Sequence, residues 1–240
     1  MAAALMISAC ALKSGNDPDV ESFKATGGKV NITCIAHSTL AITYKKYLIM
    51  VDPIENFRGN DLDYSSFRKP DIILVTHEHS DHYNPSTINK LSKESTRIIT
   101  TPKVHEMLGE GEIMENGDIV EVGNGITIEA TPAYNITPNR VKYHPMGNGN
   151  GYLLTIGGLR IFLSGDSEDI EEYAGLKDID VAFLSANQPY TMTVNQCIHA
   201  AQVINPKVLI PYHMSDTSMD RIRKGLEGSG IDVRLHKSLR

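Results

Sequence analysis

The run Ile72-Ile73-Leu74-Val75-Thr76-His77-Glu78-His79-Ser80-Asp81-His82 decides both the fold and the chemistry of this chain. Alternate side chains of an extended backbone point to the same side, so His77, His79 and Asp81 can converge while His82 faces a neighbouring position. Imidazole and carboxylate groups are the ligands that divalent transition metals prefer. The run therefore predicts a site for two adjacent metal ions rather than a solvated histidine-rich loop.

The spacing and surroundings of these histidines exclude other catalytic sites. A helical His-Glu-x-x-His protease motif needs two histidines four residues apart on a helix, whereas Pro70 and a β-branched run precede His77 and predict a strand. The chain has no Gly-x-Ser-x-Gly elbow and no Gly-x-x-x-x-Gly-Lys phosphate loop. The ligands thus lie where a strand passes into a loop.

Length and charge narrow the class of protein. A chain of 240 residues with 41% hydrophobic residues is ordinary for one domain with a sizeable core. The formal net charge of −6 and the lack of a basic run with aromatic residues argue against nucleic acid as a partner. Beyond the chain start, no apolar run approaches the ~20 residues of a membrane helix.

The first 28 residues leave two interpretations open. Ile7-Ser8-Ala9-Cys10 resembles a bacterial lipoprotein cleavage box, and residues 13–24 would then form a polar tether from a lipid anchor at Cys10. The alternative is a frayed, disordered terminus on a cytoplasmic enzyme. The protein is accordingly expected to be either a periplasmic or membrane-anchored lipoprotein, or cytoplasmic, with residues 29–240 forming a single domain. Cys10, Cys34 and Cys197 predict no disulfide framework.

Hydrophobic periodicity predicts two halves of similar organisation. Each half begins with meandering strands and ends with strand–helix units, which is a sign of an αβ/βα sandwich. The predicted strands span 30–36, 40–44, 47–51, 72–75, 98–100, 117–122, 125–130, 152–156, 160–164, 181–185 and 208–210. Helices are predicted over 84–93, 168–174 and 194–204, the last with Thr193 as N-cap. Residues 55–68 are predicted as a polar loop or short helix, and the irregular stretch 131–151 as a loop over the site.

Two later strands also end in a metal-binding residue type. Asp166 follows the strand at 160–164, and His213 follows the strand at 208–210. Ligands gathered beyond strand ends are the usual position of chemistry in α/β sheets. A carboxylate can bridge two cations through its two oxygens, so Asp166 is the expected bridge.

Taken together, these segments resemble the metallo-β-lactamase superfamily, specifically its ascorbate-6-phosphate-lactonase-like branch of metal-dependent hydrolases. The resemblance rests on Ala36-His37-Ser38, Asp52-Pro53, Thr76 to His82, Ser164-Gly165-Asp166-Ser167 and Pro211-Tyr212-His213. It implies an α/β fold of the four-layer αβ/βα metallo-β-lactamase sandwich type with a dinuclear site. The implied ligands are His77 and His79 for the first ion, Asp81, His82 and His213 for the second, and Asp166 as bridge.

One ligand of that pattern differs here. The branch usually supplies a third histidine to the first ion after an Ala-aromatic or Ala-His step, and this chain has Ala133-Tyr134-Asn135. Asn135 could coordinate through its amide oxygen or bind a metal-bound water. His144 could substitute as a ligand, although a surface histidine in a Gly- and Asn-rich loop is the preferred interpretation. Two divalent ions are expected, with zinc preferred and manganese or iron as alternatives.

The expected function is hydrolysis of a small lactone, ester, amide or phosphodiester by a metal-bridging hydroxide. Asp81 could orient that hydroxide or take up its proton. His37 is a candidate donor to the site or a buried structural histidine, and Tyr190 either lines the pocket or packs in the core. Redox chemistry is disfavoured because flavodiiron-type relatives carry a carboxylate where His79 stands. The alternatives are a nuclease or phosphodiesterase of the same fold and a non-catalytic metal-binding or sensing protein. His105, His199 and His236 are not assigned to the site.

Overall fold

Two seven-stranded sheets form the centre of the protein, and the computed structural model describes residues 19–240. In spatial order the first sheet contains β1 (Val20–Ala25), β2 (Gly28–Ala36), β3 (Thr39–Tyr44), β4 (Tyr47–Val51), β7 (Ile72–Leu74), β8 (Arg97–Thr100) and β9 (Glu112–Ile113). The second contains β10 (Ile119–Gly123), β11 (Ile126–Ala133), β12 (Gly149–Ile156), β13 (Leu159–Leu163), β14 (Val181–Ser185), β15 (Val208–Tyr212) and β16 (Asp232–Val233).

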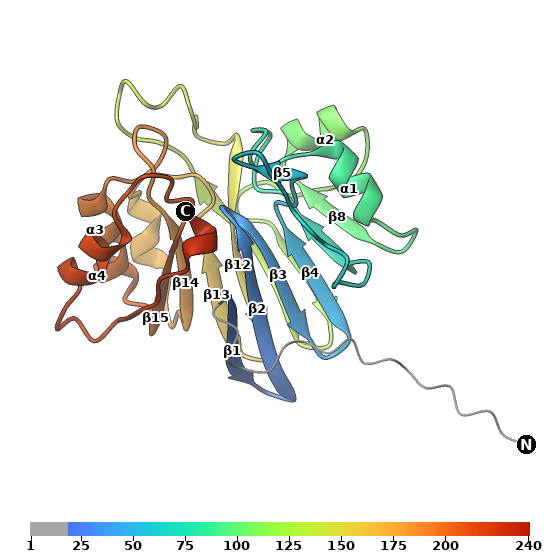
Figure 1. Ribbon diagram of the computed structural model, residues 1–240, viewed down its shortest axis with the longest axis horizontal. Helices are drawn as coiled ribbons and strands as arrows, with labels where there is room; N and C mark the ends of the chain where they lie inside the picture. Colours follow the sequence, from blue (N-terminus) through green and yellow to red (C-terminus); the bar gives the residue numbers. More distant parts are fainter. Residues whose placement is uncertain (1–18) are drawn as a thin grey trace, which may run out of the picture.

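Helices cover the outer faces of the two sheets (Figure 1). On the side of the first sheet lie α1 (Pro85–Leu91) and α2 (Pro102–Leu108), and on the side of the second lie α3 (Val194–Ile204) and α4 (Met219–Gly225). A small hairpin, β5 (Asn56–Phe57) with β6 (Asn60–Asp61), and two 3₁₀ helices, η1 (Glu171–Gly175) and η2 (Lys237–Leu239), complete the described elements. The layers are therefore helix, sheet, sheet, helix, as expected for an αβ/βα sandwich.

Each sheet changes from antiparallel to parallel pairing part-way across. Strands β1 to β4 form an antiparallel meander, and β4, β7, β8 and β9 are parallel. The second sheet repeats this order, with β10 to β13 antiparallel and β13 to β16 parallel. The parallel strands β7, β14 and β15 are buried along their whole length, as parallel strands covered on both faces are. Their carboxyl ends lie together and provide the position for a site.

Most predicted elements are confirmed, including the first meander and helix α3 with its N-cap. Thr193 accepts a hydrogen bond from Gln196 N, and the Gln196 side chain accepts one from Thr193 N, so α3 begins with a capping box. The helix predicted over 168–174 is the 3₁₀ helix η1. Residues 55–68 contain the β5–β6 hairpin instead of a helix.

Two predicted irregular segments are shorter in the structure. The tether predicted over residues 13–24 is wrong over residues 20–24, because these belong to β1 and pair with β2. Glu21 and Lys24 interrupt the apolar pattern there, whereas Phe23 and Ala25 pack against the core. The expected Cys10 cleavage box lies outside the described residues. The loop expected over 131–151 spans 134–148, since Ala133 still pairs with Gly149.

The sequence patterns miss the shorter elements α2, α4, β9 and β16. Each has seven residues or fewer, which is too short for a reliable period. Among the described residues, no helix combines the length and apolarity needed to cross a membrane.

Candidate metal centre

The candidate site lies beyond the carboxyl ends of strands from both sheets. The run from Thr76 to His82 follows β7, Asp166 follows β13, and His213 follows β15. His37 follows β2 and lies near the same place. Because each strand carries its next residues to this edge, segments far apart in sequence converge on one small volume.

Three histidines form the first group of ligand atoms. His79 Nδ1 lies 3.1 Å from His77 Nε2 and 3.2 Å from His144 Nε2. Asp166 Oδ2 lies 3.3 Å from His144 Nε2 and 3.9 Å from His77 Nε2. Four ligands at the ~2.0–2.1 Å of a tetrahedral zinc–nitrogen bond would lie about 3.3 Å from one another. The three imidazole nitrogens therefore lie close enough together to share one cation, with Asp166 beside them.

A second group lies on the other side of Asp166. His213 Nε2 is 3.2 Å from Asp166 Oδ2 and 3.4 Å from Asp81 Oδ2. His82 Nε2 is 3.4 Å from Asp166 Oδ1. Two carboxylates and two imidazoles thus converge here, and Asp166 is common to both groups.

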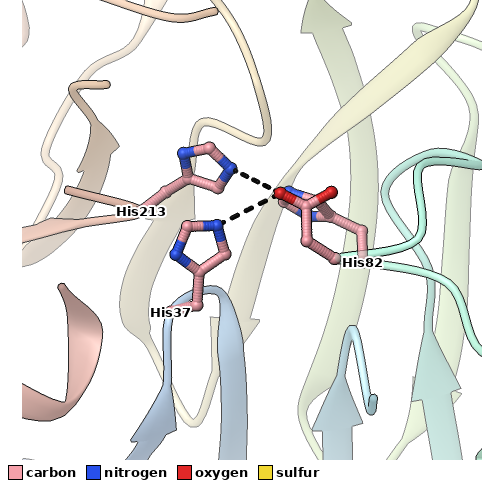
Figure 2. A group of neighbouring side chains, drawn as sticks. His37, His82 and His213 are labelled. Carbon is pink, nitrogen blue, oxygen red and sulfur yellow. Dashed lines mark hydrogen bonds and ion pairs between the residues drawn. The ribbon is translucent and has the colours of Figure 1, made fainter. Parts of the chain in front are cut away.

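His37 lies against two residues of the second group, Asp81 and His213. Its Nε2 atom lies 3.3 Å from Asp81 Oδ2, and its ring centroid is 3.8 Å from that of His213. Figure 2 shows the rings of His37 and His213 side by side, with dashed lines from both to one carboxylate oxygen. The Nε2 atoms of both rings lie within 3.4 Å of Asp81 Oδ2. Phe57 of the β5–β6 hairpin stacks on His37 at 4.2 Å between centroids. This packing holds the His37 ring between an apolar side chain and the site.

Several buried polar atoms of the site have no hydrogen-bond partner. These atoms are His82 Nε2, His213 Nε2 and Asp166 Oδ1. Buried polar atoms are nearly always paired, so a group of unpaired ones indicates a missing partner. All three residues belong to groups whose possible ligand atoms lie within 4.8 Å of one another, so the donor set fits divalent metal ions.

The electrostatics around His82 favour positive charge, whereas burial lowers the pKa of His77 and of His79. Burial lowers the pKa of His82, but Asp166 and Asp52 outweigh burial and hold this pKa well above its usual range. Burial raises the pKa of Asp166, but His213 and His82 hold it well below its usual range. The two carboxylates therefore stabilise a positive charge on the His82 ring, and a cation near Nε2 would be stabilised in the same way.

Hydrogen bonds to the far side of the His77 and His82 rings set which ring nitrogen faces the site. His82 Nδ1 lies 2.7 Å from Asp52 Oδ2, and His77 Nδ1 lies 3.0 Å from Thr76 Oγ1. Thr76 in turn donates its hydroxyl to Asp52 Oδ2 at 2.7 Å and its N–H to Asp52 Oδ1 at 2.8 Å. Such outer contacts fix the tautomer of metal-binding histidines. Sequence reasoning assigned no role to Asp52 or Thr76, although Asp52 directly follows a strand.

The interpretation of His144 as a surface histidine is wrong. His144 is 5% exposed, and its Nδ1 lies 3.0 Å from the carbonyl oxygen of Tyr190, which leaves Nε2 to face His79. Asn135 lies behind it: Asn135 N donates to His144 O at 2.8 Å, and Asn135 Nδ2 donates to Tyr190 O at 2.7 Å. The structure therefore brings His144 to the place where Asn135 was expected.

One of the two expected roles of Tyr190, packing in the core, is wrong. Its side chain is 44% exposed, so it does not pack in the core, and its ring contacts Tyr143 edge-on at 5.0 Å. Its carbonyl oxygen is the part that contacts His144.

The histidines left out of the prediction interact elsewhere. His105 contacts Gly111 O, His199 contacts Asp169, and His236 contacts Glu21.

The backbone of the site contains three residues in the left-handed region. The φ angles are +52° at His37, +43° at Asp52 and +53° at His213. Non-glycine residues adopt this region rarely, and such residues cluster at functional sites. In the turns after β2, β4 and β15, the side chains of His37, Asp52 and His213 therefore point in directions that a regular strand would not give them.

Comparison with known proteins gives a consistent result. A family model described as "Beta-lactamase superfamily domain" matches residues 31–213. A UPF0173 metal-dependent hydrolase from Thermoplasma acidophilum is 31% identical over 195 residues, which cover 78% of this chain and 83% of that protein. A crystal structure of a proposed metal-dependent hydrolase from Parabacteroides distasonis is 47% identical, with a TM-score of 0.87 over 91% of this chain and 98% of that one. A metallo hydrolase from Ignicoccus hospitalis, 20% identical over 88% of this chain and 96% of that one, shares the fold with a TM-score of 0.72.

Proposed function

The chain belongs to the β-lactamase superfamily and is a metal-dependent hydrolase, and from this premise we propose that it holds two divalent cations and cleaves a small lactone, ester, amide or phosphodiester. His77, His79 and His144 would hold the first cation. Asp81, His82 and His213 would hold the second, with Asp166 shared between them.

The observation that carries this proposal is the position of Asp166. Its carboxylate lies within 3.9 Å of Nε2 atoms from both groups, and it is buried. A carboxylate placed between two clusters of imidazole nitrogens offsets part of the repulsion between two cations. With His144 in the first group, both groups contain imidazole nitrogens suited to zinc, so we propose zinc ahead of manganese or iron.

Bound cations of this kind supply hydroxide at neutral pH and polarise a carbonyl or phosphoryl oxygen. Asp81 is the residue that we propose to move the proton, because its side chain is 42% exposed while Asp166 is buried. His37 contacts Asp81 Oδ2 and is buried, and its pKa is lowered to about 4 by burial and by His213. His37 is therefore neutral at pH 7, and an N–H at Nε2 would orient the Asp81 carboxylate.

The substrate would reach the site from the side of His79 and Asp81. These two residues are partly exposed, whereas His77, His82 and His213 are buried. A lactone is the first substrate to test, since the motifs resemble the ascorbate-6-phosphate-lactonase-like branch. The net charge of −6 gives no support to a polyanionic substrate.

The test is metal content by elemental analysis, with hydrolysis of a lactone, an ester, an amide and a phosphodiester measured before and after metal stripping. We expect about two equivalents and activity that returns on reloading. His82→Ala and Asp166→Ala should lose metal and more activity than the ~10- to 100-fold typical of outer contacts. His144→Ala should lose one equivalent, and the exposed control His199→Ala none.

Other outcomes would contradict parts of the proposal. One equivalent in the wild-type protein would contradict the dinuclear centre. Metal without any turnover would favour a binding or sensing protein. Full metal and activity in both His82→Ala and Asp166→Ala would exclude these residues as ligands.

A further inference from the structure

Glu168 is a buried carboxylate outside the proposed ligand set, two residues after Asp166. Its backbone N–H donates to Tyr134 O at 3.0 Å. A charged side chain is rarely buried fully unless it is paired and hydrogen-bonded. Its partners therefore indicate what it does.

All four side-chain hydrogen bonds of Glu168 come from one short segment of the 134–148 loop. Oε2 accepts the N–H groups of Ile136 at 2.8 Å and Thr137 at 2.7 Å. Oε1 accepts the Thr137 hydroxyl at 2.9 Å and Arg140 Nη1 at 3.1 Å. A carboxylate has about four acceptor positions, so the loop uses the full capacity of this group.

Apolar contacts contribute little to this part of the loop, although Asn135 and His144 also contact the Tyr190 carbonyl oxygen. Ile136, Val141 and Met146 are its large aliphatic side chains, and all three are exposed. Hydrophobic burial therefore contributes little to the position of this segment, although the loop delivers the buried His144 ring to the metal centre. Without Glu168, the N–H groups of Ile136 and Thr137 and the Arg140 guanidinium would lose their acceptor.

We propose that Glu168 is a positioning residue that latches residues 136–140 and so holds His144 at the first metal site. The inference rests on the proposed function, because it assigns His144 to the first cation. Asp166 and Glu168 are two residues apart, so the latch ties the bridging ligand and the loop ligand to the same turn after β13. Loss of the latch frees the loop and leaves the turn that carries Asp166 in place. It should therefore weaken the first cation and spare the second, whose other ligands Asp81, His82 and His213 are on other segments.

The test compares Glu168→Gln with wild-type protein and with Glu171→Gln. Glutamine keeps the size of Glu168 and an oxygen for the N–H groups of Ile136 and Thr137. Its NH₂ group cannot accept the hydrogen bonds that Oε1 receives from the Thr137 hydroxyl and from Arg140. Glu171 is exposed in η1, so its variant controls for the same change in charge. Thr137→Val removes one hydroxyl donor and keeps both N–H bonds, which gives a milder variant if Glu168→Gln does not fold.

Two measurements are made on each full-length protein. In the metal-free proteins, trypsin should cut after Arg140 or Lys142 several-fold faster in Glu168→Gln than in wild type or Glu171→Gln. In zinc titrations against a chromophoric chelator, Glu168→Gln should bind one of two ions about 10- to 100-fold more weakly and the other as wild type does. Thr137→Val should change both measurements in the same direction by less.

The outcomes distinguish failure of the latch proposal from failure of the proposed function. Wild-type cleavage and wild-type affinity for two ions in Glu168→Gln would overturn the latch and leave the dinuclear centre intact. Equal weakening of both ions would also overturn it, since a general loss of structure does not discriminate between sites. Wild-type protein that binds no zinc would overturn both, even if the variant were cut faster.

Discussion

Asp52 is outside the proposed ligand set, but its hydrogen bonds hold two residues of the candidate metal centre in place. It accepts from both the backbone and the hydroxyl of Thr76 and contacts His82 Nδ1. One carboxylate thereby orients the residue before the histidine run and the histidine at its end. The backbone at Asp52 is left-handed, with φ of +43°, where the chain leaves β4.

The prediction at this scale is that Asp52→Asn weakens metal binding about 10- to 100-fold. Asparagine tolerates the left-handed region, so the substitution keeps the backbone and removes one acceptor. Its N–H₂ group would then face a donor, either the His82 ring or Thr76. Zinc titration should show the loss mainly for the ion on the His82 side. Asp61→Asn, at an exposed position, is the control, and equal affinities in the two variants would contradict the prediction.

At the scale of the elements, the strand order places β12 directly against the turn that carries Asp166. A Cβ atom on Gly151 would lie 2.6 Å from Thr131 Oγ1, 2.8 Å from Leu163 O and 3.0 Å from Ser164 O. Two of these are backbone atoms at the end of β13, which cannot move without moving the following turn. Gly151 thus allows the close approach of three strands beside the site.

We expect Gly151→Ala to destabilise the protein by about 1–3 kcal/mol, the usual cost of an overpacked position. For a chain of this size each kcal/mol lowers the unfolding midpoint by about 2–4 °C. Thermal unfolding of the metal-free protein measures this directly. Gly175→Ala is the control, since nothing lies within 4 Å of the added carbon. A midpoint unchanged in Gly151→Ala would show that the strands can separate at no cost.

At the scale of the whole molecule, the metal centre lies between the two halves. His77, His79, Asp81 and His82 follow a strand of the first sheet, whereas Asp166 and His213 follow strands of the second. A cation held by ligands from both sheets binds the native protein and not the unfolded chain. Metal binding should therefore stabilise the sandwich as a unit.

The corresponding prediction is that metal removal lowers the unfolding midpoint. At free zinc 100-fold above the dissociation constant, one ion adds about 2.7 kcal/mol, which corresponds to a shift of about 5–11 °C. Differential scanning calorimetry of stripped and reloaded protein measures it. Asp166→Ala should show a much smaller shift. The same shift in that variant would show that the stabilising ion binds elsewhere.

The sequence patterns were sufficient for the sandwich and for most of the residues that converge at the candidate metal centre. The first meander was predicted from its alternating hydrophobic residues, and helix α3 from its hydrophobic period and its N-cap. Both signals are local properties of the sequence. The residues from His77 to His82 are close in sequence, and the structure places them together with Asp166 and His213. Strand β1 escaped prediction because its charged residues break the alternation, and only its pairing with β2 makes it a strand.

What the sequence by itself determined was the two-sheet fold and a cluster of metal-binding residues at strand ends, because these depend on periodicity and short spacing. Only the tertiary structure decided that His144 and not Asn135 faces the cluster, since His144 meets His79 across 65 positions of sequence. The position of His144 depends on hydrogen bonds between its loop and two residues outside the loop, the Glu168 carboxylate and the Tyr190 carbonyl. Hydrogen bonds between distant segments leave no period in the sequence, so their geometry appears only when the chain is folded.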